Sequence, residues 1–292
     1  GIMYSKPMAI LKLTRVEHSL MLVIAVVAAE LISKGLPDLF LLAMSIITPV
    51  FISMASFAIN DYYDIEVDKY NKKFNRPLVN GSLKPSDALV VTAITLVVGI
   101  GASAFINVYC FAIALVFGLL AVFYAYKLKE KLFWGNAYIA FSMAIPFIFG
   151  NYVVEPHLNE KIILITFLIF FTGLAREIHG TIRDLKGDTA VRNAKTLPKV
   201  IGVKGAAIVS LILYLAAISI SILLFLYYPP FKLNLVYIIP TAITDFMLAY
   251  VGIAYTYKSD EKFYSFARNA SLWAMALALI ALLLAPMLNL QI

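Results

Sequence analysis

LFLLAMSIITPVFISMASFAI, residues 39–59, is an apolar run that leads directly into NDYYDIEVDKYNKKFNRPL, residues 60–78, where four carboxylates follow at once. About 20 apolar residues are needed to cross a hydrocarbon core about 30 Å thick, so the first stretch predicts a membrane-spanning helix. The whole chain of 292 residues is 62% hydrophobic and 14% charged, with a mean hydropathy of +0.88. That is too much apolar surface for a soluble core, and it predicts a polytopic membrane protein.

Comparable apolar runs recur along the chain, which is therefore expected to cross the membrane nine times. Lipid offers the backbone no hydrogen-bond partner, so helices are expected. No ten-residue alternation favours barrel strands. The predicted fold is all-α: a single domain, residues 1–292, forming a nine-transmembrane-helix bundle that encloses a central cavity. The expected spans are residues 17–33, 39–59, 88–106, 109–126, 134–153, 161–178, 205–227, 235–256 and 270–288.

Basic residues are distributed unevenly between the loops on the two sides of this bundle. All but three of the 24 Lys and Arg residues lie on one side; the exceptions are Lys34, Lys161 and Lys232. Because basic loops stay in the cytoplasm, we expect a protein of the cell membrane with a cytoplasmic N-terminus, cytoplasmic charged motifs and an external C-terminus. This topology explains the net charge of +7, so no nucleic-acid partner is expected. The pattern does not indicate an oligomeric state.

The first acidic cluster continues the span predicted at residues 39–59. On a helix that advances 100° per residue, Asp61, Asp64 and Asp68 fall within about 60° of one another, with Asn60 beside them. An acidic residue at the centre of a span costs about 2.5–3.5 kcal/mol, and less near the interface. Grouped carboxylates at this place are therefore expected to have a function.

A second cluster lies in REIHGTIRDLKGD, residues 176–188, where Asp184 and Asp188 are four residues apart and adjacent on a helix. Oxygen ligands without His or Cys favour Mg²⁺, and two such clusters are suited to hold pyrophosphate between bound ions. The single cysteine, Cys110, and the widely separated histidines exclude a cysteine–histidine metal cluster. Arg76 precedes Pro77, where the chain must leave the helix, and it is expected to reach phosphate as a bidentate donor.

Together these motifs resemble the UbiA superfamily of intramembrane prenyltransferases. NDYYDIEVD reads as NDxxDxxxD, DLKGD reads as DxxxD, and NRPL follows the first motif. FYAYKLK, residues 123–129, is similar to that family's segment between spans four and five. The sequence around both motifs, with KTLP at 195–198, is most similar to the archaeal ether-lipid branch of this superfamily, the digeranylgeranylglyceryl phosphate synthases.

The resemblance implies a set of site residues. As metal ligands it implies Asn60, Asp64, Asp68, Asp184 and Asp188. Asp61 matches the motif with a less certain part in metal binding, and His18 stands where many members have Asn; both are counted as substrate-binding. Neutralisation of a diphosphate leaving group is expected from Arg76 and Lys129, together with Arg183 or Lys186. Tyr124, which the resemblance singles out, is expected to stabilise an allylic cation with its ring.

The expected reaction is Mg²⁺-dependent transfer of a geranylgeranyl group from its diphosphate to the hydroxyl of geranylgeranylglyceryl phosphate. The expected partners are a prenyl diphosphate, a lipid-phosphate acceptor and membrane lipids. An aromatic acceptor, such as a hydroxybenzoate or a quinone or haem precursor, presents a similar anionic group and remains the alternative. A cation-coupled transporter is a further alternative, but its carboxylates are expected near the bilayer midplane instead of at span ends.

Overall fold

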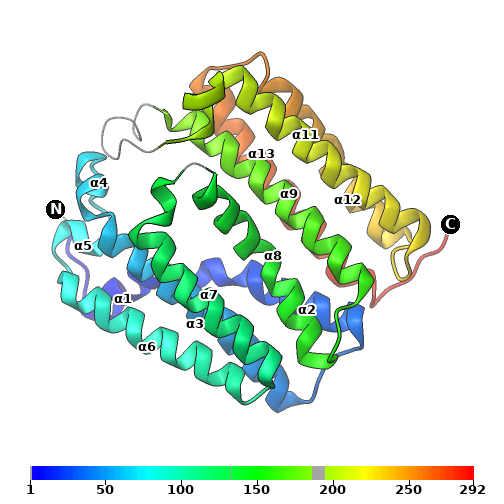
Figure 1. Ribbon diagram of the computed structural model, residues 1–292, viewed down its shortest axis with the longest axis horizontal. Coiled ribbons are helices and arrows are strands. Elements are labelled where there is room, and N and C mark those ends of the chain that lie inside the picture. The colour runs from blue at the N-terminus through cyan, green and yellow to red at the C-terminus, as the bar shows by residue number, and fades with distance from the viewer. Residues whose placement is uncertain (1, 132, 186–194) are drawn as a thin grey trace. The chain divides into compact units, whose positions relative to one another are not determined.

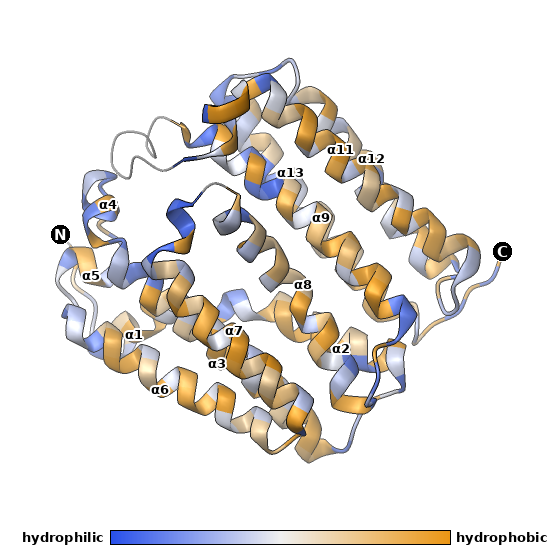
Figure 2. Ribbon diagram, in the orientation of Figure 1, coloured by the Kyte–Doolittle hydropathy of each residue, from blue (hydrophilic) through white to orange (hydrophobic). Residues whose placement is uncertain are grey.

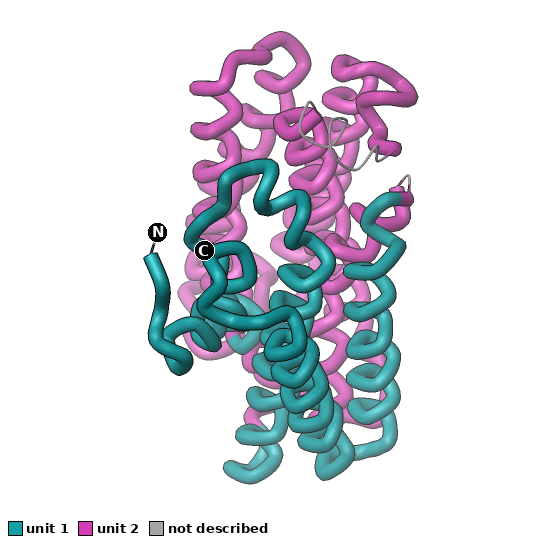
Figure 3. Tube along the Cα trace, turned by 90° about the vertical axis from the view of Figure 1, so that its left-hand side faces the viewer, with its two compact units in different colours: residues 1–23, 37–130, 187–194 teal, residues 24–36, 131–186, 195–292 magenta. Residues whose placement is uncertain are grey.

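The computed structural model describes residues 2–131, 133–185 and 195–292, and in these ranges it is helical (Figure 1). The chain divides into two compact units. Of the described residues, unit 1 holds those in 1–23 and 37–130, and unit 2 holds those in 24–36, 131–186 and 195–292 (Figure 3). The central cavity and the single domain expected from the sequence stay predictions.

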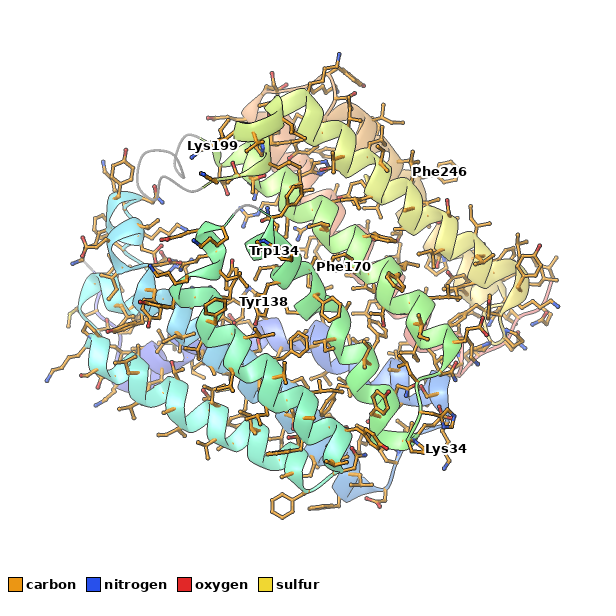
Figure 4. The ribbon with its side chains drawn as sticks, viewed as in Figure 1. Lys34, Trp134, Tyr138, Phe170, Lys199 and Phe246 are labelled. Carbon is orange, nitrogen blue, oxygen red and sulfur yellow. The ribbon has the colours of Figure 1, made fainter. Side chains whose placement is uncertain are left out.

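Nine helical segments among the described residues are long and apolar enough to span a membrane, as predicted. Figure 2 shows hydrophobic residues along the long helices and hydrophilic ones at α4 (Ile65–Tyr70) and at helix ends. Side chains such as Phe246, which is 79% exposed, project outward from α12 (Leu235–Ala254), as expected for a surface that meets lipid (Figure 4).

Several predicted span boundaries are wrong, because caps and backbone geometry set helix ends as much as apolar runs do. The first span was expected at 17–33, yet helix begins with α1 (Lys6–Thr14), then breaks into a 3₁₀ turn, η1 (Val16–Ser19), before α2 (Leu20–Ser33). The last, expected at 270–288, is α13 (Glu261–Leu284); the Asp260 carboxylate accepts a hydrogen bond from the Phe263 amide at 2.7 Å and fixes its start.

Unit 1 is built around α3 (Leu39–Tyr63), which packs mainly against α6 (Pro85–Ala104) and also contacts α7 (Val108–Tyr126). A Cβ at Gly99 would lie 3.1 Å from the Thr48 carbonyl oxygen, and the Thr48 hydroxyl donates to the Gly99 carbonyl at 2.9 Å. This close approach aligns α3 with its neighbour. Short elements then follow two of the spans: α4 and α5 (Pro77–Asn80) come after α3, and the 3₁₀ turn η2 (Leu128–Glu130) comes after α7.

Unit 2 is centred on α9 (Glu160–Arg183), which packs against α8 (Trp134–Val154) and α11 (Leu197–Tyr227), while α12 packs against α13. The seventh span was expected to begin at 205; α11 begins earlier and is kinked at Gly202, whose φ is +83°. Helices α9, α11, α12 and α13 share an apolar core that includes Ile178, Tyr214 and Val251. The core fixes the end of α9, where the second acidic motif begins.

Candidate active site

The first acidic motif sits at a break in a span. We expected one helix through residues 60–68, but α3 ends at Tyr63 and α4 begins at Ile65, with Asp64 between them at φ −98° and ψ 9°. Helical hydrogen bonding continues across the break, from the Asp64 amide to the Asn60 carbonyl at 3.0 Å and from the Asp68 amide to the Asp64 carbonyl at 2.8 Å. The side-chain directions therefore change little.

Burial agrees with the predicted shared face of this motif. Asp61 and Asp68 are only 4% and 5% exposed and Asp64 is half-buried, whereas Glu66, which the helical spacing places elsewhere, is exposed. The three aspartates thus point into unit 1. Buried carboxylates require compensating partners, because desolvation of an unpaired charge costs several kcal/mol.

Asp61 is held by two arginines. Its Oδ1 accepts a hydrogen bond from an Arg15 guanidinium nitrogen at 2.6 Å and a longer one from Arg76 at 3.4 Å. Arg15 also lies over the Phe57 ring, 4.7 Å from its centroid, and has a left-handed backbone, φ 45°, at the junction of α1 and η1. Asp61 therefore anchors two guanidinium groups that could donate hydrogen bonds to phosphate. It also lies next to Asn60, one of the expected metal ligands.

The other two aspartates contact lysines. The Lys129 ammonium donates to Asp64 Oδ1 in a short hydrogen bond, and Lys129 is brought there by η2 while its side chain is 8% exposed. Lys73 lies 3.9 Å from Asp68 Oδ1. Each of the three aspartates of the first motif is thus next to a cation supplied by a different part of unit 1, and these cations also suit a bound anion.

The polar atoms at this motif fit an oxygen-coordinated cation with a phosphate group. Asn60 Oδ1, Asp61 Oδ2 and Arg76 Nε are buried, and none has a hydrogen-bond partner within the described ranges. The first two are oxygen atoms of the kind that Mg²⁺ prefers as ligands. The third, Arg76 Nε, can donate a hydrogen bond to a phosphate oxygen. In the same ranges no three His, Cys, Asp or Glu side chains are grouped as a ready-made metal site. The first motif would therefore supply only part of the coordination shell of a metal ion.

Two further residues predicted for the site also lie in unit 1. Tyr124 is half-buried in the last turns of α7, before η2 and Lys129. His18 is exposed in η1, with its ring edge-on to Phe57 and its Nδ1 3.6 Å from a Glu17 carboxylate oxygen. Phe57 therefore contacts both His18 and Arg15, which brings His18 close to the anchored guanidinium.

The second acidic motif occupies the corresponding place in unit 2. Helix α9 ends at Arg183, and Asp184 follows at φ −99° and ψ 16°, with its amide bonded to the Gly180 carbonyl at 2.9 Å. Asp184 is exposed, and Arg183 Nε lies 3.4 Å from its Oδ1. The dihedral angles nearly match those of Asp64, so each motif places its aspartate as the first residue after a span. Lys186 and Asp188 lie outside the described residues.

Sequence reasoning missed two cations at the first motif. Arg15 was counted only as a topology signal, although its position three residues before His18 indicated a shared site. Lys73 follows Asp68 by five residues, outside the usual helical pairing, and reaches back because Lys72 has a left-handed backbone at φ 55°. An aromatic contact was missed as well: the rings of Tyr63 and Tyr126 lie 5.5 Å apart, close in sequence to Asp64 and Lys129.

Comparison with known proteins adds independent findings. A model of the UbiA prenyltransferase family matches residues 21–275. A digeranylgeranylglyceryl phosphate synthase from Archaeoglobus fulgidus is 37% identical over 273 residues, which cover 93% of each chain. A protein of the same name from Thermococcus kodakarensis is 34% identical over 74% of this chain and 76% of its own.

Solved structures agree with these sequence relatives. A structure described as giving insight into digeranylgeranylglyceryl phosphate synthase in membranes has a TM-score of 0.79 at 26% identity, covering 97% of this chain and 99% of its own. A UbiA homologue from Archaeoglobus fulgidus bound to DMAPP and Mg²⁺ has a TM-score of 0.67 at 17% identity, covering 94% and 98%. The second likeness, at this low identity, concerns the fold.

Proposed function

This chain belongs to the UbiA prenyltransferase family, and from that premise we propose that it transfers a geranylgeranyl group from its diphosphate to the free hydroxyl of geranylgeranylglyceryl phosphate. The observation that carries the proposal is the 37% identity to a digeranylgeranylglyceryl phosphate synthase over 93% of both chains. The enzyme is an intramembrane prenyltransferase with multiple spans. In the proposal, the transfer forms the second ether link of an archaeal lipid.

The proposed metal ligands are oxygen donors from both motifs: Asn60, Asp64, Asp68, Asp184 and Asp188. Support comes from the buried and unpartnered Asn60 oxygen, and from a relative of the same fold that binds DMAPP and Mg²⁺. Bound Mg²⁺ supplies charge neutralisation to the diphosphate leaving group.

The chain's own cations complete this neutralisation in the proposal. Arg76 and Lys129 already contact Asp61 and Asp64, so an incoming diphosphate meets donors that are held in place. Arg183, which contacts Asp184 in unit 2, is also assigned to neutralise the diphosphate. Lys186 is assigned the same role on the basis of its position in the sequence. Donors that are oriented before the substrate binds cost little reorganisation when the C–O bond breaks.

Heterolysis leaves an allylic cation, for which aromatic faces provide stabilisation of about 0.5–2 kcal/mol each. We assign this task to Tyr124, and the neighbouring pair of Tyr63 and Tyr126 offers further rings close to the motif in the sequence. The acceptor hydroxyl then attacks the cationic carbon and gives up its proton to a base, for which water, the released pyrophosphate and a nearby carboxylate are the candidates. A new C–O ether bond replaces the one to pyrophosphate.

We also propose that both motifs face the cytoplasm, with the N-terminus on the same side and the C-terminus outside. The basis is the concentration of Lys and Arg in alternate loops. Labelling of single cysteines introduced at Lys84 and Lys232 in sealed vesicles tests the orientation in a Cys110→Ala background. Only the cysteine at position 84 is expected to react from the cytoplasmic side.

The reaction itself is tested with purified protein in detergent or nanodiscs. Geranylgeranyl diphosphate is supplied with geranylgeranylglyceryl phosphate, with 4-hydroxybenzoate, or with no acceptor, and products are identified by mass spectrometry. The proposal expects digeranylgeranylglyceryl phosphate, loss of activity with EDTA and recovery with Mg²⁺. Prenylation of the aromatic acid alone would refute the lipid acceptor, and cation flux without any prenyl product would refute an enzyme.

Removal of one carboxylate charge tests the ligand assignment. Asp64→Asn, Asp68→Asn, Asp184→Asn and Asp188→Asn are each expected to reduce turnover by about 100-fold or more, because each removes the negative charge of a proposed metal ligand while keeping the side-chain size. Glu66→Gln is the matched control, since Glu66 is exposed in the same stretch and should leave turnover unchanged. Near-normal rates in all four variants would contradict a metal-bridged diphosphate.

A further inference from the structure

Unit 2 contains a polar cavity of which the proposed reaction has so far used only Arg183, at the end next to Asp184. It has a volume of about 190 Å³, enough for about six water molecules, and lies between α9, α13 and the residue that follows α12. Three arginines line it, Arg176, Arg183 and Arg268, together with Glu177. The formal charge of these four side chains is positive, which suits an anionic ligand.

Arg176 is held in place without a carboxylate. Its Nε donates to the Ser271 hydroxyl at 2.8 Å, and a terminal guanidinium nitrogen donates to the Arg268 carbonyl at 3.2 Å. Across the described ranges, neither Arg176 nor Arg268 has an acidic oxygen within 4.0 Å, whereas Arg15, Arg76 and the lysines of the first motif do. A guanidinium fixed in this way is suited to bind a carboxylate or phosphate from outside the chain.

Two buried side chains in the cavity wall also present polar atoms without partners. His179 and Tyr255 are each 3% exposed, and their rings stack with centroids 3.7 Å apart and an interplanar angle of 5°. His179 Nε2 and the Tyr255 hydroxyl have no hydrogen-bond partner within the described ranges. A buried polar group without a partner costs about 1–3 kcal/mol, so this pair indicates a ligand with polar atoms.

We propose that this cavity binds the phosphate of the acceptor lipid, an inference that rests on the proposed function. A phosphate monoester carries about −1.5 to −2 charges near neutral pH and accepts several hydrogen bonds. The arginines, His179 and Tyr255 are donors of the required kind, and Glu177 adds an acceptor that suits a glycerol hydroxyl. The prenyl diphosphate is a poorer match, because the assigned oxygen ligands for its metal ions lie in the two acidic motifs.

The location agrees with this assignment. Arg183 lines the cavity and also contacts Asp184, so an acceptor held by its phosphate lies beside the second acidic motif. Arg176 lies eight residues earlier on α9, about 12 Å along the helix axis from Asp184 at 1.5 Å per residue. The cavity therefore extends from the motif toward the interior of unit 2. Phosphate binding there would orient the glyceryl group relative to the donor.

Arg268→Gln is the first test, because Arg268 is exposed at the cavity and its loss leaves the apolar core intact. We expect the KM for geranylgeranylglyceryl phosphate to rise about tenfold or more, while the KM for geranylgeranyl diphosphate changes less than twofold. Arg176→Gln should act in the same direction. Lys262→Gln is the matched control, an exposed cation on the same helix that does not line the cavity, and it should change neither constant.

Direct binding separates this inference from the reaction. sn-Glycerol 1-phosphate is titrated into detergent-solubilised protein by calorimetry, and Arg268→Gln should weaken its binding about tenfold. If another acceptor proves to be the substrate while this arginine-dependent binding remains, the proposed reaction fails and the phosphate site stands. If the expected lipid is made but binding and acceptor KM are the same in wild type and both arginine variants, the site is refuted. An increase confined to the donor KM also refutes it.

Discussion

Asp61→Asn tests the most densely paired carboxylate in unit 1. The substitution keeps the side-chain size but removes the charge that faces Arg15 at 2.6 Å and Arg76 at 3.4 Å. Loss of one member of a buried ion pair costs about 3–5 kcal/mol. The two guanidinium side chains are 20% and 22% exposed, so water offsets part of this, and we expect unfolding free energy to fall by about 3 kcal/mol.

The assay is equilibrium unfolding in mixed lipid–detergent micelles, followed by circular dichroism. Double-mutant cycles with Arg15→Met and Arg76→Met should give coupling energies of about 2 kcal/mol for the shorter contact and under about 1 kcal/mol for the longer one. Glu66→Gln, an exposed acid in the same stretch, should stay within about 0.5 kcal/mol of wild type. Unchanged stability combined with lost turnover in Asp61→Asn would refute the anchoring role and point to direct metal binding.

Three further substitutions test other contacts. Lys129→Met should lower kcat about 100-fold, measured by steady-state kinetics. Its effect should be non-additive with that of Asp64→Asn, so that the double variant loses less activity than the product of the two single losses; additive effects would contradict a shared role. Gly150→Ala places a Cβ 2.4 Å from a carbonyl oxygen of α2 and should lower the free energy of unfolding by about 1–3 kcal/mol. Gly101→Ala, whose Cβ would have nothing within 4 Å, is the control and should leave it unchanged. Equal stabilities of the two variants would exclude the close approach at Gly150. Asn234→Ala removes the hydrogen bonds from the side-chain amide to three backbone carbonyls at 3.0–3.3 Å. It should lower the free energy of unfolding by about 2 kcal/mol in the same assay, and no change would show that these contacts contribute nothing to stability.

Hydropathy was sufficient to predict the nine spans, because desolvation of the backbone in lipid permits few other structures. It was insufficient for their ends. The start of α13 depends on an Asp260 cap, and the kink in α11 depends on one glycine at positive φ. The first turns of α13, residues 261–269, read EKFYSFARN, and their charged and polar residues have the hydropathy of a loop, so the last span was placed nine residues too late.

At the site, too, the sequence pattern predicted local positions but not the contacts between elements. Helical periodicity predicted that Asp61, Asp64 and Asp68 share a face, and their burial agrees. It could not predict that Asp61 would contact Arg15, which is 46 residues distant, because tertiary packing of α1 against α3 determines that pair. The stacking of His179 on Tyr255 is likewise a contact between elements, without any local sequence signal.

The matched backbone at Asp64 and Asp184 has an electrostatic consequence. Both carboxylates follow the last residue of a span, toward which the negative ends of the span's peptide dipoles point, although at Asp64 helical hydrogen bonding continues into α4 and spreads part of that charge. Side chains of the same sign raise the local field instead of opposing it, so each terminus attracts counterions more strongly than its formal charge indicates. We therefore expect multivalent cations to protect these two helix ends against fraying, observable as slower amide hydrogen exchange in the last turns of α3 and α9.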